Sequence, residues 1–327
     1  MDSHQGKKEV AGNVCRHVLI FLFTSSRFCD TMAPSSNGRT AGSQPAYLDS
    51  NSGGVTFKKE RKGSEMSEEK KDKVADRVGN ATEILFSYDT TGSMSGCIAD
   101  VRKHLEETCE QMFQDIPGLK IGLIAHGDWC DGDNKIHSLP LTNDKAAIFN
   151  FIRNAPNTSG GDAPECYELA LHVARGLGWS DQGGTGRVMV LIGDATPHEP
   201  DYPENTDHLD WRVELNALRE MGINVYALQC LSSEYSIHEN SFWGEVAERG
   251  GGKRMLLNEF CESAVTLQGI TYAAAGTEAF ATYEKRLEEY SATMNFCCSD
   301  DVIARNSVLR REAFKYDELR KEATDEK

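Results

Sequence analysis

The chain has 327 residues, of which 39% are hydrophobic and 26% are charged, and its formal net charge is −16. This length and apolar content suffice for a sizeable core and favour a soluble globular protein with one domain of about 200 residues plus flanking segments. Residues 81–327 carry 41 acidic against 22 basic side chains. Such a surface repels phosphate backbones and anionic lipid, which disfavours nucleic acid and membrane as partners.

The first 80 residues show no hydrophobic periodicity, and from Asp30 onward they are rich in Ser, Gly, Asn and charge. We predict a disordered tail and charged linker over residues 1–80. The apolar run at 18–23, VLIFLF, is too short to span a bilayer and short even for a signal peptide. Ten cysteines without a C-x-x-C pair indicate free thiols. We therefore expect a cytoplasmic protein, with a secreted protein as the alternative.

From residue 82 onward, short apolar runs alternate with helical patterns. Runs rich in Val, Ile and Leu are typical of strands buried on both faces of a parallel sheet, and they lie at 84–88, 119–125, 188–192 and 223–228. The run 137–141 contains Pro140 and suits an edge strand. Helical spacing predicts helices at 98–116, 146–152, 166–177 and 211–221, and again beyond residue 260.

This alternation predicts an α/β fold with an open, doubly wound sheet flanked by helices. We divide the chain into the tail and linker at 1–80, an α/β domain at 81–262 and a helical C-terminal extension at 263–327.

Polar side chains follow the carboxyl ends of the predicted strands, where such sheets bind ligands. The first strand ends in SYDTTGSMS, which contains Asp89, Thr91 and Ser93, and a later one ends in IGDATP, which contains Asp194. Hydroxyl and carboxylate oxygens converging from separate loops form the ligand set that Mg²⁺ or Mn²⁺ prefers. A helix cap alone would explain Ser93 but not the aspartate at a second strand end.

The pattern D-x-T-x-S formed by Asp89, Thr91 and Ser93 resembles the D-x-[ST]-G-S-M signature of von Willebrand factor A (vWA) domains and their metal-ion-dependent adhesion site. Asp194, after VMVLIG, is similar to that family's second aspartate. The resemblance covers roughly residues 82–262. It implies a Rossmann-like, mostly parallel sheet with Mg²⁺ on its top face. It also implies partner binding, often through an acidic side chain that completes the metal's coordination.

The middle loop, NTSGGDAPE at 157–165, departs from the usual pattern of the family. Most members place a threonine ligand there, whereas the matching position here is Asp162, and GGDxPE resembles a variant of intracellular and microbial vWA proteins. We favour Asp162 as the ligand because a Gly-Gly turn precedes it and a helix follows; Thr158 is the alternative. A third carboxylate would tighten metal binding and weaken the attraction for an acidic partner.

The acidic loop at 127–134, GDWCDGDN, has three possible roles. It either forms a partner-binding rim with Asp128, Trp129 and Asp131, or holds a second cation, or is a solvated loop. His126 and His198 flank strand ends, and we assign neither a catalytic role, because a hydrogen-bonded loop histidine is the commoner case.

The leading functional hypothesis is a metal-dependent protein-binding module that acts as an interaction or scaffold protein and not as an enzyme. No convincing pair of nucleophile and general base stands beside the expected metal ligands. A metal-dependent hydrolase and a secreted adhesion protein are the alternatives.

Overall fold

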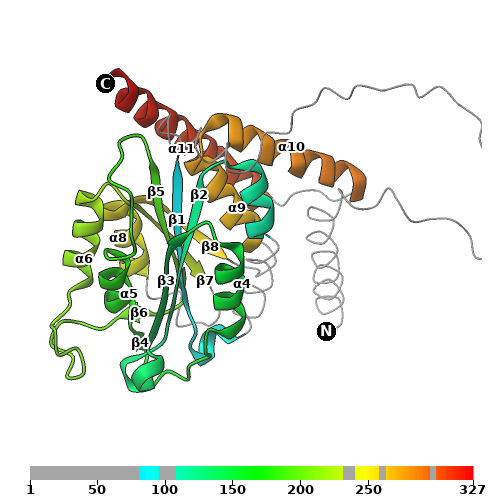
Figure 1. Cartoon of the computed structure of the whole chain (residues 1–327). Coiled ribbons are helices and arrows are strands. Elements are labelled where there is room, and N and C mark those ends of the chain that lie inside the picture. Colours follow the sequence, from blue (N-terminus) through cyan, green and yellow to red (C-terminus); the bar gives the residue numbers. More distant parts are fainter. Residues whose placement is uncertain (1–80, 96–107, 231–239, 258–262, 295–299, 327) are drawn as a thin grey trace, which may run out of the picture.

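The computed structural model describes residues 81–95, 108–230, 240–257, 263–294 and 300–326 (Figure 1). The predictions for residues 1–80 lie outside the described residues, as does the 98–107 part of the first predicted helix. Its remainder is helical over 108–115, and the chain then turns at Pro117 and Gly118 into the next strand.

Six strands form one sheet in the order β3-β2-β1-β5-β7-β8. They are β1 (Thr82–Asp89), β2 (Leu119–His126), β3 (Ile136–Thr142), β5 (Gly186–Gly193), β7 (Asn224–Cys230) and β8 (Gly251–Leu257). All neighbours pair in parallel except β3, which runs antiparallel to β2 at one edge. The chain leaves β1 toward β2 on one side and later returns to β5 on the other, which confirms the predicted doubly wound α/β fold.

Helices cover both faces of this sheet (Figure 1). One face carries α5 (Tyr167–Ala174), α6 (Trp211–Glu220) and α8 (Asn240–Gly250). The other carries α4 (Lys145–Asn154) and α9 (Ser263–Ala274), with α10 (Thr277–Met294) and α11 (Asp300–Asp325) packed on α9. Among these described helices, none is both long and apolar enough to cross a membrane.

The central strand β1 contributes to two separate hydrophobic clusters because successive side chains of a strand point to opposite faces. Ile84 and Phe86 pack in the cluster that includes Leu267 and Tyr272 of α9. Leu85 packs in the cluster with α5, α6 and α8. Both faces of β1 are therefore apolar, which explains why its sequence does not alternate. The residues after 262 thus contribute to the same core as the sheet.

The edge strand β8, which directly follows α8, was absent from our sequence prediction. Gly251 does end the helix, with a φ of 70°, but the chain enters β8 at once. A side chain at Gly252 would overlap the backbone of Val225 in β7. The glycines therefore both end α8 and allow β8 to approach its neighbour closely.

Candidate metal centre

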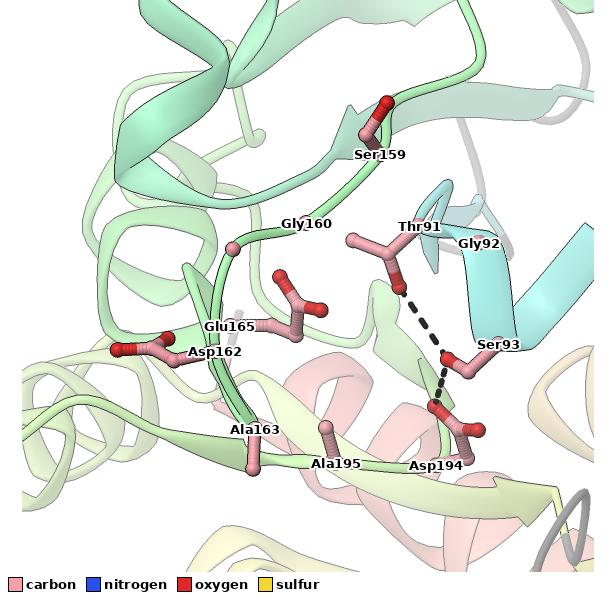
Figure 2. A pocket seen from close by; sticks show the side chains of 11 residues that line it. Thr91, Gly92, Ser93, Ser159, Gly160, Asp162, Ala163, Glu165, Asp194 and Ala195 are labelled. Carbon is pink, nitrogen blue, oxygen red and sulfur yellow. Dashed lines mark hydrogen bonds between the residues drawn. The ribbon is translucent and has the colours of Figure 1, made fainter.

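A pocket of about 280 Å³ lies where β1 and β5 end (Figure 2). Three loops build it: the turn after β1, the middle loop, and the turn after β5. Its lining residues are Thr91, Gly92, Ser93, residues 159–163, Glu165, Asp194 and Ala195. The pocket thus occupies the edge of the sheet where the sequence predicted a ligand site.

Asp89, the last residue of β1, is fully buried beneath the pocket and does not line it. Its Oδ1 accepts hydrogen bonds from the backbone N–H of Thr91 at 2.8 Å and from the Thr91 hydroxyl at 2.7 Å. Its Oδ2 accepts one from the Tyr167 hydroxyl at 2.7 Å. Burial raises the pKa of Asp89 to about 6 despite these donors. Asp89 therefore holds Thr91 in place from below.

Two further predicted ligands meet Thr91 at the pocket wall. The Ser93 hydroxyl donates to Oδ1 of Asp194 at 3.1 Å, which links residues 101 positions apart in the chain. The hydroxyl oxygens of Thr91 and Ser93 are 3.4 Å apart (Figure 2). The structure thus brings together three oxygen-bearing side chains from two loops, as the sequence predicted.

Glu165 is a pocket residue that our sequence prediction did not include among the ligands. Its side chain is directed into the pocket (Figure 2), the residue is 4% exposed, and Oε2 has no hydrogen-bond partner. Burial, together with the charges of Asp89 and Asp128, raises its pKa to about 10. A buried carboxylate oxygen without a partner is costly and indicates a place for a cation or a proton.

A two-stranded pairing fixes the position of Glu165. Strand β4 (Pro164–Glu165) runs parallel to β6 (Thr196–Pro197), so the middle loop is attached to the turn after β5. In the sequence, the glutamate of GGDAPE is the feature that could have indicated this pocket residue. Two residues are too short a strand for periodicity to reveal that this side chain faces the pocket.

The two middle-loop residues considered from the sequence, Asp162 as the favoured ligand and Thr158 as its alternative, point elsewhere in the structure. Asp162 lines the pocket, but its carboxylate is turned away from Thr91 and Ser93 (Figure 2) and lies 3.4 Å from Nε2 of His198. Thr158 does not line the pocket, and its hydroxyl forms a 2.9 Å hydrogen bond with the Thr90 hydroxyl. Neither therefore joins the oxygen cluster in this conformation.

The acidic loop at 127–134 is held by hydrogen bonds within itself and to neighbouring segments. Asp128 is fully buried, and its side chain caps the short helix η2 (Trp129–Asn134) in a capping box with Asp131. Asp131 also accepts from the backbone N–H of Ser159 at 3.1 Å. The indole N–H of Trp129 donates to Glu168 at 2.7 Å. The predicted rim residues thus tie the middle loop to the body of the domain.

The oxygen cluster fits a hard divalent cation. Thr91, Ser93, Glu165 and Asp194 present hydroxyl and carboxylate oxygens, with no nitrogen or sulfur among the side chains that line the pocket. Mg²⁺ and Mn²⁺ take such ligands and keep several waters. The orphaned oxygen of Glu165 is the observation in favour of a bound cation. These four residues are the ones that would hold it.

The sequence matches no family model and no curated protein. Among solved structures, the chain is similar to the pilus adhesin SpaC from Lactobacillus rhamnosus GG in its open conformation, at 13% identity and a TM-score of 0.44. A second structure of this adhesin gives 13% and 0.43. The matches cover 64% of this chain but only 30% and 31% of the adhesin. At this identity, function has to be argued from the site itself.

Proposed function

We propose that this chain is a vWA-type protein-binding module that uses a divalent cation, Mg²⁺ or Mn²⁺, at the pocket to capture a protein partner. Support comes from the sheet topology, with its antiparallel edge strand β3 and its ligand pocket at the ends of β1 and β5. Support also comes from the D-x-T-x-S signature, whose Thr91 and Ser93 lie at the pocket wall.

The observation that carries the proposal is the convergence of Ser93, Asp194 and Glu165 from three separate loops. Asp194 and Glu165 are nearly buried, at 6% and 4% exposure. Two carboxylates buried at one pocket lose hydration, so a cation bound there stabilises the folded site. A site without a cation would need a proton on Glu165 to offset its burial, whereas a bound cation also gives Oε2 a partner.

Binding rather than catalysis is the function that the lining side chains support best. They include no His, Cys, Lys or Arg, so a reaction there would depend on the carboxylates and a bound cation alone. A metal-dependent hydrolase is the alternative. We expect phosphoester hydrolysis by the Mg²⁺-loaded protein to remain at background, and metal-dependent turnover that Asp194→Asn abolishes would favour the hydrolase.

The charge balance indicates what kind of group the partner presents. Asp89, Glu165 and Asp194 place three carboxyl groups at or beneath the pocket. With all three ionised, a dication leaves the local charge at about −1, so an incoming carboxylate gains little and is repelled. We therefore propose a neutral oxygen donor, such as a backbone carbonyl or a hydroxyl group, as the partner's contribution to the metal.

Calorimetric titration of the full chain with Mg²⁺ and Mn²⁺, followed by partner capture in Mg²⁺ and in EDTA, tests this proposal. Asp194→Asn keeps the size of the side chain and should lose both metal binding and capture. Asp201→Asn, at an exposed position outside the pocket, is the matched control and should behave as wild type. Equal metal affinity of both variants, or capture that EDTA leaves unchanged, would refute the proposal.

We also propose a cytoplasmic location, with secretion as the alternative. Among the cysteines that the structure describes, Cys130 and Cys166 are free thiols, which supports a reducing compartment. Mass spectrometry of the native protein should find all ten cysteines reduced, and any native disulfide would favour the secreted alternative.

A further inference from the structure

A second cluster of ligand-type side chains lies outside the pocket. Asp128 after β2, Cys166 at the start of α5 and His198 after β6 come from three loops, and one ligand atom of each lies within 4.8 Å of the others. All three residues are buried. None of them lines the pocket described above, although Cys166 directly follows Glu165. These three residues therefore form a cluster that is distinct from the lining of the pocket.

The polar atoms of this cluster lack hydrogen bonds that burial would normally require. Both ring nitrogens of His198 and Oδ2 of Asp128 have no hydrogen-bond partner, and the two side chains are 0% and 1% exposed. Buried polar side chains are nearly always hydrogen-bonded. These three buried polar atoms, on two side chains that face each other, therefore point to a missing ligand.

The surroundings orient His198 in the way that metal-binding histidines are oriented. Its Nδ1 lies 3.6 Å from Oε1 of Glu168. Glu168 is itself fixed by the indole of Trp129 at 2.7 Å and by the backbone N–H of His198 at 3.1 Å. A carboxylate beside one ring nitrogen leaves the other nitrogen free to bind a metal. Here Nε2 faces Asp128 Oδ1 at 3.3 Å and Asp162 Oδ1 at 3.4 Å.

We propose that Asp128, Cys166 and His198 hold a transition metal ion, with Zn²⁺ preferred, and that Asp162 is the fourth ligand on the solvent side. A thiolate, an imidazole and two carboxylates suit Zn²⁺ and are a poor set for Mg²⁺. The side chain of Asp162 is 47% exposed, and its carboxylate is turned out of the neighbouring pocket (Figure 2). This assignment explains why Asp162 does not face Ser93 and Asp194.

Metal binding at this cluster displaces protons. Burial, with the charges of Glu168 and Asp128, raises the pKa of the Cys166 thiol, so the metal-free protein carries a thiol there. Burial alone would lower the pKa of His198, but Glu168, Asp128 and Asp162 outweigh it and raise that pKa. Binding of Zn²⁺ therefore releases the proton of the Cys166 thiol to solvent. Where His198 is an imidazolium, binding also releases its second ring proton.

The competing explanation is a metal-free ion pair, in which a protonated His198 neutralises the surrounding carboxylates. The two explanations differ in the role of sulfur, because an ion pair does not involve Cys166. A probe that reports a metal–sulfur bond therefore separates them.

The test uses the full chain, stripped with a chelator and titrated with Co²⁺ and then Zn²⁺. We expect one equivalent of Co²⁺ to produce the intense ultraviolet charge-transfer band of a cobalt–thiolate bond, and Zn²⁺ to abolish it by replacement. Excess Mg²⁺ should leave the band unchanged. The absence of the band in the wild-type protein overturns the proposal without reference to any variant.

Variants assign the ligands. Cys166→Ser should remove the charge-transfer band, whereas Cys109→Ser, at a buried cysteine in the hydrophobic cluster that includes α9, should keep it. Asp162→Asn, at an exposed side chain with little risk to folding, should weaken Zn²⁺ affinity at least tenfold, and unchanged affinity would overturn its role as the fourth ligand. Asp194→Asn separates the two sites. If that variant loses Zn²⁺, the ion occupies the pocket and the second site does not exist.

Discussion

The Tyr167 hydroxyl donates a 2.7 Å hydrogen bond to Oδ2 of Asp89, across 78 positions of the chain. Oδ1 of the same carboxylate accepts both the backbone N–H and the hydroxyl of Thr91. Tyr167 is fully buried between Phe242 and Trp243 of α8 and His126 of β2. The aromatic core beneath the sheet edge therefore determines where the first residue of the D-x-T-x-S motif lies.

The first prediction concerns removal of this hydroxyl. Tyr167→Phe leaves a buried carboxylate oxygen without its donor, which should lower the free energy of unfolding by about 1–3 kcal/mol. Because Asp89 then holds Thr91 less firmly, Mg²⁺ affinity should also fall. Urea unfolding and calorimetry measure the two effects. Tyr316→Phe is the matched control, since its hydroxyl accepts from Asn224 at 2.7 Å far from the pocket. That variant should lose stability but keep Mg²⁺ affinity.

The second prediction concerns Gly193, the last residue of β5. A Cβ atom there would overlap the Tyr167 hydroxyl and lie 2.7 Å from Cζ of that ring. Gly193→Ala should therefore displace the ring and destabilise the protein by about 1–3 kcal/mol. In the double variant with Tyr167→Phe, the overlap with the hydroxyl disappears. The double variant should therefore lose less stability than the sum of the losses in the two single variants. Strict additivity in urea unfolding would show that the two positions do not contact each other.

The third prediction separates two carboxylates of the middle loop. Glu165→Gln retains the shape of the side chain but removes the charge from the pocket, so Mg²⁺ affinity should fall at least tenfold. Asp162→Asn should change Mg²⁺ affinity by less than about threefold, because its carboxylate points away from Ser93 and Asp194. Calorimetric titrations of the two variants decide between the residues. The reverse order of effects would establish Asp162 as the ligand that the GGDxPE resemblance favoured.

The fold and part of the pocket followed from local sequence signals. The strands were recognisable because β1, β2, β5 and β7 are buried on both faces and therefore have nearly continuous apolar sequences. Thr91, Ser93 and Asp194 were recognisable because each follows such a strand within a few residues. β8 was not recognisable in the same way, since this strand begins with glycines followed by two basic residues.

The residues that sequence reasoning missed depend on long-range packing. Glu165 faces the pocket because β4 pairs with β6, 32 positions further along the chain. Tyr167 reaches Asp89 only because Gly193, on another strand, leaves room for its ring. Asp162 and Glu165 are three positions apart in one loop, and their different directions follow from the positive φ of 69° at Gly160 and the pairing at Pro164. No local pattern encodes these relationships.

The last prediction concerns pH and His126, which is fully buried at the end of β2 with neither ring nitrogen hydrogen-bonded. Burial lowers its pKa to about 3 in the folded protein, while the unfolded chain takes up this proton near pH 6.5. The unfolded state therefore binds more protons below pH 6.5, and the contribution of neutral His126 to stability is lost as the pH falls from there toward 3. Between pH 7.5 and 5.0 this residue should account for about 2 kcal/mol of lost stability. His126→Phe retains a ring against Tyr167, 4.8 Å away, and should lose correspondingly less over that interval in urea unfolding with EDTA. Equal losses in the wild-type protein and the variant would show that the pKa of His126 is the same in the folded and the unfolded state.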